Sequence, residues 1–324
     1  MRSLNLGALA RAAKAHIQGG GLPAEIQAVG TDTRSLPSGS LFVALRGDRF
    51  DGHDYLEQAA AAGAVAAMVD AQGVPEVSPL PLLVVEDTLV GLGAVARHVR
   101  ELHPGPTIGV TGSNGKTTTK ELVAAALSPQ GAVHKTAGNL NNRIGVPLTL
   151  FDWADQWAAV IEMGMNESGE IQVLAEMARP AVGVITVVGP AHIENLGTLE
   201  NIARAKGELF GALEVDATAI VNADDPLIQS ISVPLLRGQR TLSFGHRETA
   251  DVRVVSAQAE DEGVVVEFSA LGKELKSRIP FPGLHNAGNA AAALACAVAL
   301  EVPVEDAAAA LADTVLPGSR LVIR

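Results

Sequence analysis

The hydrophobic pattern after residue 106 repeats as a short apolar run followed by a longer segment of helical periodicity. The apolar runs are rich in β-branched residues, as buried strands are. Four of them are predicted strands: "TIGV" (107–110), "AAVIEM" (158–163), "AVGVITVV" (181–188) and "TAIVN" (218–222). Strands that alternate with helices form a mostly parallel sheet with both faces covered. The pattern therefore predicts a central α/β domain.

A smaller αβ unit is predicted ahead of it, over residues 1–84. Its strands are "SLFVAL" (40–45), "AVAAMV" (64–69) and "LLVVE" (from 82), with a helix over 53–63 between the first two. A linking helix over 87–102 follows. We place the domain boundary between residues 84 and 85.

Residues 240–281 break the alternation and predict an antiparallel meander. Its strands are "DVRVVSAQ", "GVVVEFSAL" and "ELKSRIPF", with turns at 261–263 and 272–273. Two helices follow, over roughly 285–300 and 304–313. We assign 85–316 to the central domain. The final "LPGSRLVIR" begins another element, so 317–324 is expected to be a hinge to a third domain that this sequence lacks.

Composition and charge narrow the possible partners. Hydrophobic residues make up 48% and aromatic residues 3% of the chain, so Ala, Val and Leu must fill the cores. A net charge of −12 argues against a nucleic-acid or anionic-membrane partner, and any anionic ligand must be bound by local donors. Cys296 is the one cysteine, which fits a reducing compartment. With no signal peptide and no apolar run of 18 residues, we expect a soluble, cytoplasmic protein without a membrane span. We also expect a monomer.

The segment "GVTGSNGKTTTKEL" (109–122) follows the first central strand and resembles a phosphate-binding loop. The strict Walker A pattern fails, because Val110 stands where its first Gly should be. Gly112 and Gly115 still let backbone N–H groups turn toward an anion at a helix N-terminus. Lys116 would reach the terminal phosphates and the Thr117 hydroxyl would bind Mg²⁺. The alternative is an ordinary Gly/Ser/Asn turn before a helix.

Two further strand ends carry groups suited to a metal or phosphate site. Glu162 ends the second central strand, and His192 follows the third in "GPAHIENLG". Ligands of open α/β sheets bind beyond the carboxyl ends of the strands, which all lie at one edge. The alternatives are a capping or solvated carboxylate and a hydrogen-bonded loop histidine. The coincidence of three strand ends favours a site for Mg²⁺ and nucleotide.

Lys206 is out of place in the segment "LENIARAKGELFGAL". Leu199, Ile202, Leu209 and Leu213 form one apolar helical stripe, and Lys206 falls within it. Such a lysine ordinarily extends to solvent. If it is buried, desolvation lowers its pKa and frees a neutral amine, which could react with CO₂ to give an anionic, metal-binding carbamate.

Six motifs in order now identify a resemblance. They are "TGSNGKTT", "GNLNNRIGVPLTL", "EMGMNESGEI", "AHIENLG" with "AKGELF", "NADDP" and "GLHNAGNAAAALA". Together they resemble the Mur ligases of peptidoglycan (cell wall) synthesis, over residues 28–320. "EMGMN" and the N-terminal "TDTRSLPSGSLFVALRGDRFDGHDY" are most similar to the branch that joins D-alanyl-D-alanine to UDP-N-acetylmuramoyl-tripeptide.

The resemblance implies an ADP-forming ligase that makes a C–N bond. ATP phosphorylates the substrate carboxylate, and the amine of D-alanyl-D-alanine then attacks the acyl phosphate. Because two anions must be brought together, catalysis would depend mostly on positive charge at the site and on positioning of the substrates. The resemblance assigns the catalytic roles to Lys116, Glu162, His192 and Lys206, with Mg²⁺ held by Thr117, Glu162, His192 and a carbamylated Lys206.

The resemblance also implies binding residues. The ATP site would comprise Thr111, Gly112, Ser113, Asn114, Gly115, Lys116, Thr117, Thr118, Asn286, Asn289 and, in the hinge, Arg320. The two asparagines would lie near the adenine, the alternative being polar helix caps. Asn139, Asn142 and Arg143 would face the muramoyl peptide, and Thr33, Arg34, Ser35 and Arg46 would hold the uridine diphosphate. For these the alternatives are an Asn-rich turn and an ordinary polar loop.

The resemblance fails at one place. The family has a C-terminal domain that closes over the site, so turnover by this chain alone is doubtful although substrate binding is expected. The rivals are another Mur ligase or a folylpolyglutamate synthase, and a non-catalytic module that binds UDP-sugars. A P-loop NTPase that drives motion fits least, because Asp225 in "NADDP" is not placed as a Walker B residue.

Overall fold

The chain folds as two compact units. The computed structural model describes residues 4–21, 23–191 and 193–316. The first unit comprises Met1–Pro104 and Arg143–Ala154, and the second comprises Gly105–Asn142 and Asp155–Arg324. None of the helices in the described ranges has the length and apolarity needed to cross a bilayer.

A five-stranded sheet of order β2-β9-β8-β5-β4 forms the centre of the first unit. Its strands are parallel except for β2. Two short antiparallel pairs, β1–β3 and β6–β7, are added to it. The strands are β1 (Leu4–Asn5), β2 (His16–Gln18), β3 (Glu25–Ile26), β4 (Ala28–Gly30), β5 (Ser40–Val43), β6 (Arg46–Gly47), β7 (Phe50–Asp51), β8 (Ala66–Asp70) and β9 (Leu82–Val85). The helices are α1 (Leu6–Ala12), η1 (Gly52–Tyr55), α2 (Leu56–Ala61), η2 (Ala71–Gly73), α3 (Thr88–Leu102) and α5 (Gly145–Phe151).

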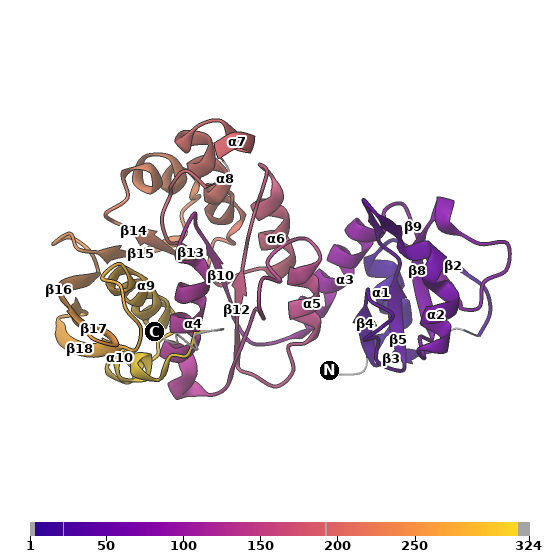
Figure 1. Ribbon diagram of the computed structural model, residues 1–324, viewed down its shortest axis with the longest axis horizontal. Helices are drawn as coiled ribbons and strands as arrows, with labels where there is room; N and C mark the ends of the chain where they lie inside the picture. Colours follow the sequence, from indigo (N-terminus) through magenta and orange to yellow (C-terminus); the bar gives the residue numbers. More distant parts are fainter. Residues whose placement is uncertain (1–3, 22, 192, 317–324) are drawn as a thin grey trace. The chain divides into compact units, whose positions relative to one another are not determined.

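The second unit contains a nine-stranded sheet of order β11-β12-β10-β13-β14-β15-β16-β17-β18 (Figure 1). The strands are parallel from β11 to β16, and β16, β17 and β18 are antiparallel to one another. They are β10 (Thr107–Thr111), β11 (Val133–Lys135), β12 (Ala158–Glu162), β13 (Val182–Ile185), β14 (Thr218–Asn222), β15 (Arg240–Gly245), β16 (Val252–Glu260), β17 (Gly263–Ala270) and β18 (Lys273–Ile279). After β10 the chain first adds β11 and β12 on one side of it and then β13 and β14 on the other. Strand β10 therefore marks the topological switch point, where such sheets bind ligands.

Helices cover both faces of this sheet. Helices α4 and α9 pack against each other, as do α6 and α8. The helical segments are α4 (Lys116–Leu127), η3 (Ser128–Gln130), α6 (Glu170–Ala178), α7 (Ile193–Leu196), α8 (Leu199–Ala212), η4 (Ile228–Ser232), η5 (Val233–Leu235), α9 (Asn286–Ala299), α10 (Val304–Ala310) and η6 (Leu311–Asp313). The alanines of α9 over 290–297 are fully buried, which shows how a chain with few aromatics fills its core with small, closely packed residues.

Two strand glycines let α8 approach the sheet closely. A Cβ at Gly109 would lie 3.1 Å from the Leu209 side chain, and one at Gly183 would lie 3.1 Å from Leu213 and 3.2 Å from Leu209. A larger residue at either position would press on these leucine side chains, which would have to shift by a few tenths of an ångström. The predicted apolar stripe of α8 is confirmed, with Ile202 and Leu209 fully buried.

The predicted fold class is confirmed. The four predicted parallel strands are β10, β12, β13 and β14, and the meander is β16–β18. The structure differs at β15, which was not predicted. Its six residues extend the parallel sheet by pairing with both β14 and β16, whereas the sequence pattern ends the parallel section before residue 240.

The compact units divide the chain later than the predicted boundary at residues 84 and 85. Helix α3 packs on α1 and α5, so the first unit continues to Pro104. The predicted helix over 53–63 begins as the 3₁₀ turn η1, capped by the Asp51 carboxylate, and becomes α-helical at Leu56. The predicted hinge over 317–324 lies outside the described residues.

The fold predicts an inert thiol. Cys296 is completely buried in α9, and burial raises the pKa of its thiol well above the ordinary value. We expect the native protein to react with a thiol-specific disulfide reagent only as fast as it unfolds, whereas the urea-unfolded chain should react at once with one equivalent. Rapid reaction of the native protein, with Cys296→Ser as the blank, would show that α9 is not packed as described.

Candidate functional site

The predicted phosphate loop lies at the switch point of the large sheet. It leaves β10 after Thr111, spans residues 112–115 and enters α4 at Lys116. Gly112 has a φ of 151°, and a Cβ there would stand 1.9 Å from the Thr186 hydroxyl. Gly115 has a φ of 79°, and its Cβ would stand 2.7 Å from Asn289 Oδ1. Both positions therefore require glycine, which explains why the loop keeps them although it lacks the first Walker A glycine.

Hydrogen bonds fix this loop to the segment after β13. The Ser113 N–H donates to the Val187 carbonyl at 2.8 Å, and the Thr186 hydroxyl donates to the Asn114 carbonyl at 2.5 Å. The Thr111 hydroxyl instead donates to Met163 O at 2.9 Å, so this predicted ATP residue is used to join β10 to β12. The loop is held on both sides before any ligand binds.

Lys116 folds back over the loop, where its Nζ donates to Gly112 O at 2.9 Å. Burial lowers the pKa of Lys116, and the Glu162 carboxylate partly opposes that shift. Thr117 and Thr118 occupy the first turn of α4 beside it. The ammonium group is thus close to the backbone that would surround a phosphate.

The structure brings Thr117 and Glu162 together, as predicted. Glu162 ends β12 and is 2% exposed. Its Oε2 accepts a hydrogen bond from Thr117 Oγ1 at 3.0 Å, and its Oε1 accepts one from Asn141 Nδ2 at 2.9 Å. The two side chains whose oxygen atoms could bind Mg²⁺, Thr117 and Glu162, are therefore adjacent at the N-terminus of α4.

Asn141 contacts the candidate site through Glu162, and the sequence analysis did not name it. It lies in "GNLNN", where Asn139 and Asn142 were chosen instead. Only the fold shows that its side chain turns to Glu162. Three asparagines in four positions were a signal of a polar turn, but the spacing alone does not say which one points inward.

Lys206 is buried, so the ordinary expectation for a lysine in an apolar stripe, that it extends to solvent, is wrong here. It is 2% exposed on α8, and no hydrogen bond or ion pair involves its amine within the described part of the chain. Burial, reinforced by repulsion from Lys116, lowers its pKa from 10.5 to about 7. A large fraction of the amine is therefore neutral near physiological pH. His192 lies outside the described residues.

The start of α9 lies against the phosphate loop. Asn289 accepts a hydrogen bond from the Thr119 hydroxyl at 3.2 Å and donates to Asn286 Oδ1 at 3.0 Å. Asn286 in turn donates to Pro282 O at 2.8 Å. Both predicted asparagines thus share one network beside the loop. Arg320 lies outside the described residues, and within those ranges no three His, Cys, Asp or Glu side chains form a metal-binding group.

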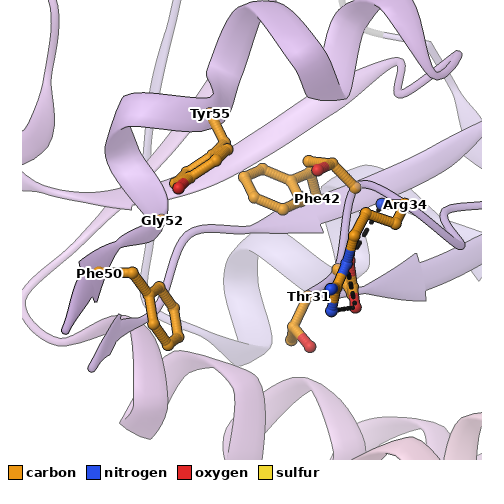
Figure 2. A pocket seen from close by; sticks show the side chains of 8 residues that line it. Thr31, Arg34, Phe42, Phe50, Gly52 and Tyr55 are labelled. Carbon is orange, nitrogen blue, oxygen red and sulfur yellow. Dashed lines mark hydrogen bonds and ion pairs between the residues drawn. The ribbon is translucent and has the colours of Figure 1, made fainter. Parts of the chain in front are cut away.

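A cavity of about 460 Å³ opens in the first unit (Figure 2). Two predicted residues, Thr33 and Arg34, line it together with residues that were not predicted: Thr31, Asp32, Phe42, Phe50, Gly52 and Tyr55. The Arg34 guanidinium pairs with Asp32 at 2.6 Å and lowers the pKa of that carboxyl to about 2. The aromatic rings were recognisable from composition, because Tyr55 is the only tyrosine in a chain that is 3% aromatic.

The other two predicted uridine-diphosphate residues are placed beside this cavity but do not line it. Ser35 closes a turn, its N–H donating to Asp32 O at 3.3 Å. Arg46 pairs with Asp70 at 2.9 Å and with Asp51. Arg46 therefore joins the β6–β7 hairpin to β8 and supports the segment that carries Phe50 and Tyr55.

The three residues predicted to face the muramoyl peptide are divided between the units. Asn139 and Asn142 belong to the second unit and Arg143 to the first. The Asn139 carbonyl accepts the Asn141 N–H at 2.7 Å, which forms the turn that presents Asn141 to Glu162. Arg143 Nε is buried and has no hydrogen-bond partner among the described residues.

These features define an α/β protein with a P-loop at the switch point of a central sheet and a separate αβ unit that carries a cavity. The sequence matches the Mur ligase middle domain over residues 110–297 and the Mur ligase family, catalytic domain, over residues 25–126. The chain belongs to the Mur ligase family.

Two curated relatives have the same name, UDP-N-acetylmuramoyl-tripeptide–D-alanyl-D-alanine ligase. The one from Bacillus subtilis is 39% identical over 91% of this chain and 64% of its own length. The one from Synechocystis is 44% identical over 83% of this chain and 57% of its own length. The chain therefore spans less than two thirds of either relative.

Solved structures show the same similarity. MurF from Acinetobacter baumannii superposes with a TM-score of 0.92 at 32% identity, covering 99% of this chain and 70% of that protein. MurF from Thermotoga maritima in complex with ADP superposes with a TM-score of 0.78 at 31% identity, covering 87% and 65%.

Lys206 predicts a distinctive dependence of stability on pH. Because its pKa is about 7 in the folded protein and 10.5 ordinarily, the unfolded chain holds a proton that the native chain lacks between these values. The free energy of unfolding of the wild type, relative to Lys206→Met, should therefore rise with pH through this window by a few kcal/mol and level off above it.

Urea unfolding in carbonate-free buffer measures this difference. Lys276→Met is the matched control, because the Lys276 side chain is 67% exposed and its removal takes away no buried amine. A flat profile for Lys206→Met would mean that the Lys206 amine is solvated.

Proposed function

We propose that this chain provides the UDP-substrate site and the ATP site of a ligase that joins D-alanyl-D-alanine to UDP-N-acetylmuramoyl-tripeptide. The observation that carries the proposal is the pairing of the Thr117 hydroxyl with the Glu162 carboxylate beside Lys116 on the P-loop. The names of the relatives and the ADP complex of the Thermotoga protein support the same assignment. We place the reaction in the cytoplasm, in a monomeric enzyme.

The donors at the P-loop fit Mg²⁺. Thr117 and Glu162 both present oxygen atoms, which Mg²⁺ prefers, and they are already held in mutual contact. When bound with nucleotide, the cation would neutralise phosphate charge. Lys116 would hold the β- and γ-phosphates, with Gly112 and Gly115 providing the close backbone approach.

The reaction joins two anions, so local positive charge must offset their repulsion. The substrate carboxylate would attack the γ-phosphorus of ATP, releasing ADP and forming an acyl phosphate. The D-alanyl-D-alanine amine would then add to the acyl carbon, lose a proton and expel phosphate. Lys116 would stabilise the charge that develops on the transferred phosphoryl group.

Lys206 suits carbamylation. Its neutral amine would form an N–C bond to CO₂ and release one proton, giving an anion on α8. The lowered pKa supports this proposal because only the neutral amine is nucleophilic. The carbamate, Glu162 and His192 would together be the ligands of a second Mg²⁺.

The cavity of the first unit would receive the uridine diphosphate. Phe50 and Tyr55 are 58% and 41% exposed, and they offer flat surfaces to a base. Arg34 lines the same cavity; its Nε and Nη2 are bonded to Asp32, and its Nη1 would donate to a phosphate. Arg143, with its unpartnered Nε, would meet an anionic part of the substrate.

Calorimetric titration with UDP-N-acetylmuramoyl-tripeptide tests the substrate assignment. We expect the tripeptide form to bind more tightly than UDP or the dipeptide form, in the presence of Mg²⁺ and a non-hydrolysable ATP analogue. If no uridine ligand binds to folded protein, the cavity is not the substrate site.

Tyr55 gives a sharper test of the same site. Removal of the ring in Tyr55→Ala should weaken UDP binding by roughly tenfold, since base–aromatic stacking contributes on the order of 1–3 kcal/mol. Tyr55→Phe keeps the ring and should bind as the wild type does. Equal losses in both variants would assign the effect to the hydroxyl and not to stacking.

Gly112 tests the nucleotide site. In Gly112→Ala the new Cβ meets the Thr186 hydroxyl, so the loop must open and ADP–Mg²⁺ binding should fall by at least about tenfold. Gly238→Ala is the matched control, because Gly238 also has positive φ, 101°, but an added Cβ meets nothing within 4 Å. Equal nucleotide affinity in the two variants would contradict the assignment of the loop.

A further inference from the structure

Three charged side chains are buried side by side behind the P-loop. Lys120 is 0%, Glu121 3% and Glu162 2% exposed. Lys120 and Glu121 lie on α4, one turn after Lys116 and Thr117, while Glu162 ends β12. Burial of this many charges is costly unless each is paired.

Lys120 is at the centre of the group. Its Nζ donates to Thr136 O at 2.8 Å and lies 3.3 Å from Glu121 Oε1 and 3.8 Å from Glu162 Oε2. Lys135, half-exposed at the end of β11, pairs with the other oxygen of Glu121. Glu121 is therefore paired with two lysines, Lys120 and Lys135, and Glu162 lies near the positive charge of Lys120.

Lys120 acts on Glu162 through its charge and does not hold the carboxylate in position by a hydrogen bond. Hydrogen bonds from Thr117 and Asn141 already orient both Glu162 oxygens, and its backbone N–H donates to Thr136 Oγ1. At 3.8 Å the ammonium adds no further hydrogen bond. What it adds is positive charge at short range in a site that excludes water, where charges interact strongly.

Glu162 is consequently neutralised before any metal arrives. Lys120 lies 3.8 Å from one of its oxygens, and Lys116 is close enough for the Glu162 charge to raise the pKa of Lys116 against the effect of burial. A divalent cation that approaches alone would meet both ammonium groups. Mg²⁺ also gives up its water reluctantly, so one neutralised carboxylate is a poor site for the free ion.

We propose that Lys120 is the resident counter-ion of Glu162 and makes cation binding depend on nucleotide phosphates. The phosphates bring the negative charge that Lys116 and Lys120 otherwise oppose, so the metal binds with the nucleotide and not before it. This inference rests on the proposed ATP site. Lys120 is thus a specificity-determining residue that acts through Glu162.

Mn²⁺ binding to the whole 324-residue chain, followed by electron paramagnetic resonance, tests the inference without any need for turnover. The main variant is Lys120→Met/Glu121→Gln, which removes one charge of each sign so that no new unpaired charge is buried beside Lys135. Without nucleotide, it should bind Mn²⁺ at least tenfold more tightly than the wild type. With ADP present, the two proteins should differ much less.

Two further variants keep the result interpretable. Glu121→Gln keeps Lys120 and should show no gain in free Mn²⁺ binding. Lys120→Gln can still donate to the Thr136 carbonyl and should show the gain if the double variant does not fold, as judged by circular dichroism.

The outcomes separate this inference from the proposed function. If the wild type shows ADP-dependent Mn²⁺ binding that Glu162→Gln abolishes, yet neither Lys120 variant gains affinity for the free ion, Lys120 is only a structural partner of Glu121 and the inference is overturned. If the wild type binds no Mn²⁺ even with ADP, the proposed metal site itself fails, and the inference fails with it.

Discussion

The close contact between α8 and the central sheet is the constraint on which the site depends. Gly109 and Gly183 leave no side chain on the sheet surface where Leu209 sits. Lys206 precedes Leu209 by three residues, so the packing that buries the leucine also buries the amine. The burial that lowers the pKa of Lys206 therefore accompanies the close packing of α8 that two glycines on neighbouring strands allow.

The same arrangement explains how an acidic chain can bind polyanions. The net charge of −12 gives no long-range attraction for ATP or for a UDP-sugar. The positive groups are instead concentrated at short range, on the first turns of α4 and at the start of the loop after β4. A phosphate at the P-loop would meet the half-buried Lys116, with the fully buried Lys120 behind Glu162.

Much of this site could be predicted because its elements are long and periodic. The strand ends located the loop and Glu162, and the broken stripe of α8 located Lys206. The missed residues depend on contacts between distant segments. Asn141 is chosen from its neighbours by the turn at Asn139, and β15 is a strand because β14 and β16 flank it. Lys120 resembles any solvated lysine in "KTTTKEL", since nothing local reveals that β11 and β12 cover that side of α4.

Carbamylation of Lys206 would alter the balance of charge that the other lysines set. As an amine, Lys206 is destabilised in its charged form by Lys116, and that repulsion is one reason for its low pKa. As a carbamate it would attract Lys116, so the same proximity would stabilise the modified form. Lys116 would then lie near two anions, the carbamate and Glu162. If Lys206 is carbamylated as proposed, the same neighbour, Lys116, would disfavour its protonation and stabilise its carbamate.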